Sequence, residues 1–155
     1  MTSDEEARAI SELLAGDRWA IAHGFQDNCP RIVRYRNGIS LGLDRSEHQH
    51  LVLIRWNYPE AAGKEGLPST DDLDEIGRFE DALLAAVERP LGDVLVSATT
   101  GQCQRVWALY VQSPEAFVEK FGNVHTPTDG RPIEVGIWMD PDWGYFFNET
   151  LGAID

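Results

Sequence analysis

Four side chains in the last third of the chain are of the types that hydrolytic enzymes use. Asp140 and Asp142 stand two residues apart, Glu134 precedes them, and His125 lies upstream of all three. A carboxylate pair near a histidine is the minimum for general acid–base catalysis or for metal-assisted hydrolysis. The same acids around Pro141 also suit a strand exit, because Asp caps a turn and Pro starts it. The hydrolase hypothesis therefore requires that these side chains converge on one concave pocket.

A second set of residues is typical of protein interfaces. It consists of Arg55, Tyr110, Glu134 and Trp138. These four share one sheet face, turned away from the helices, if Leu53 and the alternating series from Ile133 face the core. Exposed aromatic rings beside arginine are what a protein-binding surface prefers. The alternative is that an N-terminal hairpin covers this face. Glu80 is a further binding candidate, and its alternative role is a structural pair with an arginine at the sheet edge.

Two patterns resemble metal sites, and each has a simpler explanation. His48 and His50 project to the same side of a strand, as two ligands of a transition metal would, but no third ligand is evident. The acids at positions 71, 72, 74 and 75 open a helix, where they complement its dipole. Neither Cys29 nor Cys103 has the spacing of a zinc site. No GxSxG, phosphate-binding glycine loop or dinucleotide fingerprint occurs. We therefore expect no metal and no cofactor.

The charge of the chain limits its partners. Its 155 residues include 26 acids and 13 bases, a formal net charge of −13, and 43% of them are hydrophobic. This charge repels nucleic acid and anionic membranes and suits a basic protein partner. Residues 18–58 are the exception, with six Arg against three acids, a balance of 6 − 3 = +3. No apolar run of 18 residues and no signal-like start occurs, so we expect a cytoplasmic protein.

The predicted elements that position these candidates begin with one clear helix. Residues 69–89 carry apolar side chains at the spacing of an amphipathic helix, with Ser69 as N-cap and Pro90 at its end. A shorter helix is predicted at 113–121, an N-terminal one over 3–15 with Ser3 as cap, and a helical turn after 140. Strands are predicted at 19–25, 32–36, 48–58, 94–100, 104–112 and 132–140. The strand at 48–58 is apolar on both faces, so we place it centrally in the sheet.

The order of these elements predicts the fold class. From residue 49 onward it is strand, helix, strand, strand, helix, strand, which is the split βαβ pattern of ferredoxin-like α+β sandwiches. Helices should then cover one face of an antiparallel sheet. The N-terminal helix, residues 1–16, and the first hairpin are additions that extend the sheet or cover its open face. Residues 17–155 are expected to form a single α+β domain.

Four short motifs resemble those of a known family. They are Gly66-Leu67-Pro68, Phe79-Glu80-Asp81, the strand end from Trp107 to Tyr110, and Asp140-Pro141-Asp142-Trp143. Their order and spacing resemble the bacterial family catalogued as domain of unknown function 695, over about residues 17–147. That family has no established activity. Its members are sometimes joined to a domain similar to a ribonuclease inhibitor, so the resemblance implies a regulatory, protein-binding role.

The leading functional hypothesis is a non-catalytic protein-binding or regulatory module with a basic protein partner. One alternative is a small, metal-assisted hydrolase built on the carboxylate cluster. Another is an immunity protein that neutralises a basic nuclease toxin, and a homodimer is a further alternative for the partner. Catalysis is disfavoured because no nucleophile–base pair can be placed beside Asp140.

Overall fold

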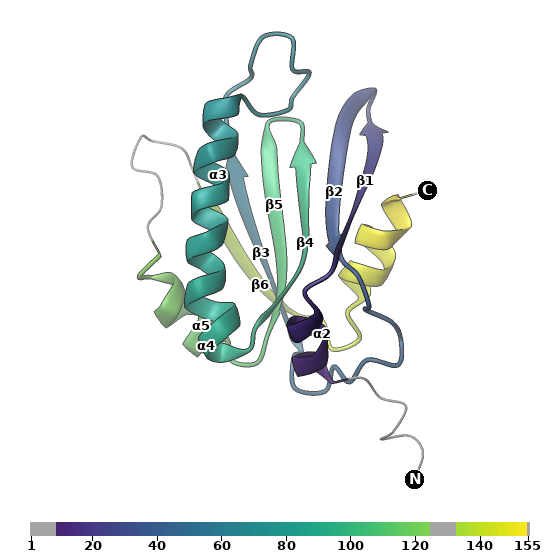
Figure 1. Cartoon of the computed structure of the whole chain (residues 1–155), viewed down its shortest axis with the longest axis vertical. Coiled ribbons are helices and arrows are strands. Elements are labelled where there is room, and N and C mark those ends of the chain that lie inside the picture. The colour runs from purple at the N-terminus through teal and green to yellow at the C-terminus, as the bar shows by residue number, and fades with distance from the viewer. Residues whose placement is uncertain (1–8, 125–132, 155) are drawn as a thin grey trace.

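In the computed structural model, which describes residues 9–124 and 133–154, the strands form one antiparallel sheet of six (Figure 1). They are β1 (Trp19–Gln26), β2 (Cys29–Arg36), β3 (His50–Asn57), β4 (Val94–Gly101), β5 (Gln104–Val111) and β6 (Ile133–Met139). The strand order across the sheet is β1-β2-β4-β5-β3-β6. The predicted α+β class is confirmed. β3 lies between β5 and β6, where its doubly apolar sequence is buried on both faces.

The helical segments lie between and after the strands. They are α2 (Ile10–Gly16), α3 (Thr70–Leu83), η1 (Leu84–Glu88), α4 (Arg89–Leu91), α5 (Pro114–Phe121), η2 (Tyr145–Thr150) and η3 (Leu151–Ala153). Segments η1 and η2 are π-helical, and η3 is a 3₁₀ turn. None of the helices in the described ranges is long and apolar enough to cross a membrane. The predicted Ser3 cap lies outside the described residues.

The predicted helix from residue 69 forms, but it ends later than expected. Ser69 Oγ accepts a hydrogen bond from the backbone amide of Asp72 at 3.2 Å, as an N-cap should. The prediction that Pro90 ends the helix is wrong, since the helix continues to Leu91 and stops at Gly92, where φ is +74°. A π-helical turn already departs from the α-helical bonding just before Pro90. The missing amide and the ring of proline are therefore tolerated there.

The two faces of the sheet carry separate apolar cores. Trp56 and Trp107 pack with Phe79 of α3 and with α5 on one face. Leu53 packs on the other face in a cluster that includes α2 and η2. The condition that Leu53 and the series from Ile133 face one core is therefore not met, because Leu53 lies opposite Gly136 in the register. Helical segments consequently cover parts of both faces, since β3 presents apolar side chains to each.

The N-terminal hairpin extends the sheet and leaves its far face to other elements. β2 pairs with β4, and Arg34 lies opposite Ala98. The turn between β1 and β2 consists of Asp27 and Asn28, whose φ values of 52° and 66° suit a two-residue hairpin turn. Asp and Asn tolerate this backbone conformation better than most residues. The strands are therefore longer than the sequence predicted, and β1 becomes one edge of the sheet.

Candidate functional site

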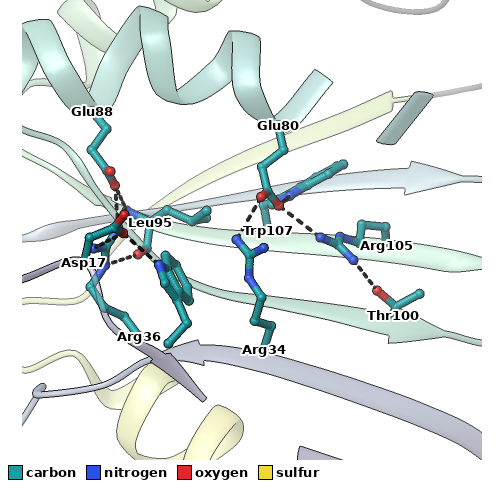
Figure 2. Close-up of polar contacts among 10 residues, drawn as sticks. Asp17, Arg34, Arg36, Glu80, Glu88, Leu95, Thr100, Arg105 and Trp107 are labelled. Carbon is teal, nitrogen blue, oxygen red and sulfur yellow. Dashed lines mark hydrogen bonds and ion pairs between the residues drawn. The ribbon is translucent and has the colours of Figure 1, made fainter. Parts of the chain in front are cut away.

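Glu80 is the centre of a buried polar cluster between α3 and the sheet (Figure 2). Its Oε2 lies 2.8 Å from Nη2 of Arg34 on β2, and its Oε1 lies 2.9 Å from Nη2 of Arg105 on β5. Trp107 Nε1 donates a third bond to Oε1 at 2.8 Å. Figure 2 shows these side chains pointing toward one another across the two layers. Both carboxylate oxygens are therefore used within the fold, as the structural alternative for Glu80 predicted.

The charge of Glu80 depends on its two arginine partners. Burial alone would raise the pKa of Glu80, but the positive charges of Arg34 and Arg105 outweigh it and hold the pKa below its usual value. Arg105 also donates to Thr100 Oγ1 at 2.7 Å. An ionised carboxylate whose two oxygens both accept hydrogen bonds from the sheet holds the helix against it.

A second arginine on β2 makes a matching contact further along the helix. Arg36 is 1% exposed, and its Nη2 lies 2.8 Å from Oε2 of Glu88 on η1. Its Nε donates to the backbone carbonyl of Leu95 at 2.9 Å. The guanidinium groups of Arg34 and Arg36 both lie over the Trp19 ring, and each guanidinium carbon is 4.4 Å from the ring centroid. The hairpin is thus fastened to the helix at two points.

The sequence carries a pattern that could have predicted these two contacts. Arg34 and Arg36 are two apart on a strand and face one side, while Glu80 and Glu88 are eight apart, about two helical turns. The two glutamates differ in their environment. Burial raises the pKa of Glu88, and one arginine offsets this only in part, whereas Glu80 has two. These two Arg–Glu pairs were not predicted from the sequence, because the tertiary fold sets the register between α3 and β2.

The residues of the hydrolase hypothesis do not form one pocket in the described part of the chain. Asp140 caps the turn into η2, accepting from the amides of Gly144 at 2.9 Å and Tyr145 at 3.0 Å. Glu134 lies six residues earlier along β6, about 20 Å away. Asp142 is exposed, and its carbonyl accepts from Arg45. None of these three acids lines the cavity around His48 or the one around Arg31.

The fourth hydrolase candidate, His125, lies outside the described residues. Asp140 has a structural partner as well as its backbone ones, because Tyr110 donates to its Oδ2 at 2.7 Å. The geometry of Asp140 therefore matches the alternative in which the acids around Pro141 form the exit from a strand. These hydrogen bonds of the partly buried Asp140 hold η2 in place.

The four interface candidates lie on one sheet face but differ in exposure. The strand register places Arg55 directly opposite Glu134, and Leu51 opposite both Tyr110 and Trp138. Tyr110 is fully buried, and its ring stacks on Trp143 with centroids 4.2 Å apart. Trp138 is 48% exposed. The face that these residues share is therefore open at β6 and closed at β5.

The two histidines that could chelate a metal ion, His48 and His50, occupy different positions in the fold. His48 precedes β3, is 4% exposed, and its Nε2 lies 2.8 Å from the carbonyl of Gly92. Burial lowers its pKa, so the ring is neutral near pH 7. His50 begins β3. Among residues 9–124 and 133–154, no group of three or more His, Cys, Asp or Glu side chains is placed to hold a metal ion.

The outer strand β6 is the most prominent candidate interface. It pairs with β3 alone within the described sheet, so its other edge is unpaired. Val135, Trp138 and Met139 are 41%, 48% and 60% exposed. A Cβ atom at Gly136 would overlap the Trp138 ring, so this ring lies over the glycine with its other face in solvent. We call this surface, formed by Val135, Trp138 and Met139, the β6 edge.

These features define a structural class. The protein is an α+β protein with a six-stranded antiparallel sheet, in which buried Arg–Glu pairs join the sheet to a helix and one edge strand exposes apolar side chains. The family follows from comparison with known sequences. The chain belongs to DUF695, a family of unknown function, whose model matches residues 17–150. The predicted resemblance over about residues 17–147 is confirmed. No curated protein matches the chain.

Proposed function

We propose that this protein is a non-catalytic module that binds a basic protein segment along the β6 edge. The observation that carries the proposal is the half-exposed Trp138 ring, seated on Gly136 beside an unpaired strand edge. Aromatic anchors of this kind dominate binding energy in protein interfaces. An extended segment can add to such an edge as a further strand, and the backbone then supplies hydrogen bonds. Val135 and Met139 would contact the alternate side chains of that segment.

The charge distribution supports a basic partner at this edge. Glu134 is exposed on β6, Asp142 follows the strand, and Glu115 and Glu119 are exposed on α5. The opposite edge of the sheet also exposes apolar side chains, Ile21 and Phe25, but these lie in the arginine-rich part of the chain. A basic segment is attracted to the exposed acids at the first edge. The net charge of −13 speeds its encounter at low salt.

The finer fold description and the location belong to the same proposal. The connectivity from β3 to β6 and the strand order β4-β5-β3-β6 support a ferredoxin-like core to which the β1–β2 hairpin is added. Cys29 and Cys103 are unpaired and partly exposed, as suits a reducing compartment such as the cytoplasm.

The proposal is tested with a Trp138→Ala, Val135→Lys variant of the full chain. Wild-type protein, immobilised in low salt, should enrich a basic protein from an extract of the source cells, and the variant should lose it. Truncation of a central aromatic anchor costs about 2 kcal/mol or more, so the captured amount should fall about 30-fold. The control is Phe25→Ala, Ile21→Lys at the opposite edge, which should bind like wild type.

Other outcomes of this capture experiment would identify a different binding surface or a different partner. Equal capture by all three proteins excludes the β6 edge as the interface. Loss only in the Phe25, Ile21 variant moves the site to β1. A wild-type dimer that the β6 variant splits on gel filtration makes a second copy of this chain the occupant. If the captured protein is a nuclease toxin whose activity the wild-type protein blocks, the partner identifies this chain as an immunity protein. Only the net negative charge supports this form of the proposal.

A further inference from the structure

A polar cavity of ≈ 300 Å³ lies where the C-terminal segment meets the ends of two hairpins. Figure 1 shows this segment, in yellow, beside β1 and β2. The side chains in its lining that can bind a polar ligand are Gln26, Arg31, Gln102, Gln104, Tyr145 and Glu149. The volume is at the small end of the range for ligand pockets, which limits the occupant to a small molecule. This cavity lies apart from the β6 edge, so the two sites are independent.

Two opposite charges line this cavity without pairing with each other. The ion pairs among the described residues include neither Arg31 nor Glu149. Arg31 donates one long hydrogen bond, to Gln26 Oε1 at 3.3 Å. Within the described chain, the Glu149 carboxylate has no hydrogen-bond partner. A guanidinium and a carboxylate that share a cavity in this way offer one site for an anionic group and one for a cationic group.

The segment that carries Glu149 is anchored at its start. Asp140 caps the start of η2, and Trp143 Nε1 donates to the carbonyl of His48 at 2.7 Å just before it. In a π-helical segment, residues four and five apart lie nearly above one another. Tyr145, Glu149 and Thr150 can therefore all face the cavity. Such segments are frequent at functional sites, because they place side chains where an α-helix would not.

On the opposite wall, a hydrogen bond links the two hairpin turns. Gln102 Nε2 donates to Asp27 Oδ2 at 3.3 Å, which links the β4–β5 turn to the β1–β2 turn. A Cβ at Gly101 would lie only 3.0 Å from the Pro30 carbonyl oxygen, so the two strands approach closely there. Links of this kind reduce the reordering that a cavity needs when a ligand enters.

We propose that this cavity binds a free α-amino acid with a short polar side chain, Arg31 holding its carboxylate and Glu149 its ammonium group. A free α-amino acid offers both charges a few bonds apart, whereas one end of a peptide offers one of them. The rest of the ligand faces amides and hydroxyl groups, since Gln102, Gln104 and Tyr145 surround the charges. Burial raises the pKa of Tyr145, so its hydroxyl is a neutral donor at physiological pH.

The proposal is tested by calorimetric titration and thermal melting of the full chain with L-serine, L-asparagine, L-glutamine and glycine. At least one should bind with a dissociation constant in the millimolar range or tighter. Arg31→Gln and Glu149→Gln should each weaken this binding about 10-fold or more, since each removes a charge-assisted contact. For serine, ethanolamine lacks the carboxylate and 3-hydroxypropionate lacks the amine, and both should bind at least about 10-fold more weakly for the same reason.

Matched control variants are Arg89→Gln and Glu119→Gln, which make the same changes at exposed positions away from the cavity. Both should bind like wild type, and cooperative melting of all four variants without ligand shows that they fold. No binding of any probe at millimolar concentration overturns the proposal. So does equal binding of 3-hydroxypropionate, which makes the cavity an anion site, or equal binding of ethanolamine, which makes it an amine site.

Discussion

Asp93 is a buried carboxyl group whose charge the fold opposes. It is 1% exposed, its Oδ1 accepts from the Gln112 amide at 3.3 Å, and its Oδ2 has no partner in the described chain. Burial, with a smaller contribution from the nearby charge of Glu88, raises the pKa of Asp93 to about 7. The folded protein therefore favours the neutral acid, whereas the unfolded chain ionises near pH 4.

The Asp93→Asn variant should gain stability relative to wild type as the pH rises. A carboxyl group whose pKa is raised by folding stabilises the folded state at pH values below its unfolded pKa. This stabilisation is lost as the pH rises through the folded pKa. The difference in unfolding free energy, variant minus wild type, should grow by up to about 4 kcal/mol between about pH 4 and about pH 7. Urea titration at several pH values measures it. His48 titrates in both proteins, so its contribution cancels in this difference. A difference that does not change with pH would mean that folding leaves the pKa of Asp93 unshifted.

At the scale of elements, the contacts of Glu80 join α3 to β2 and β5. Glu80→Ala leaves Arg34, Arg105 and the Trp107 indole without their acceptor in a buried site. Breaking a buried ion pair by removing one partner costs about 3–5 kcal/mol, so chemical denaturation should show a loss of that size. Glu119→Ala, on the exposed face of α5, should change stability by no more than about 0.5 kcal/mol. Equal effects of the two substitutions would show that the cluster contributes nothing.

Elements with strong local patterns were predictable from the sequence. The helix from Ser69 and the hairpin turn at Asp27 and Asn28 depend on spacing, caps and backbone preferences that neighbouring residues determine. The place of the hairpin was not predictable, because extending the sheet and covering its face bury similar side chains. The choice depends on the free edge of β4, which only the assembled sheet defines.

The candidate sites were less predictable than the elements for a related reason. Asp140 has the residue type and neighbours of a catalytic acid, yet its carboxylate is occupied by backbone amides of a π-helical turn that has no sequence periodicity. Arg31 and Glu149 are more than a hundred residues apart, so their shared cavity follows only from the fold. Trp138 was predictable as an exposed aromatic, because strand alternation alone places its side chain on the other face of the sheet from Ile137 and Met139.

At the scale of the whole molecule, the net charge of −13 acts against the compact state. Like charges on the surface repel each other, and this repulsion is relieved on unfolding. Raising the NaCl concentration from about 0.01 M to about 1 M shortens the screening length from about 30 Å to about 3 Å. The buried pairs, such as Arg36 with Glu88, are screened far less. Salt should therefore weaken the repulsion more than the attraction.

The melting temperature at neutral pH should accordingly rise with NaCl, by about 2–4 °C for each kcal/mol of repulsion removed in a chain of this size. Glu119→Lys moves the net charge two units toward zero at an exposed position. This variant should melt higher than wild type at low salt and respond less to added NaCl. A melting temperature that falls with salt would mean that the exposed contacts, such as Asp17 with Arg36, outweigh the repulsion among the remaining acids. The stability of this protein would then depend on local ion pairs and not on its overall charge.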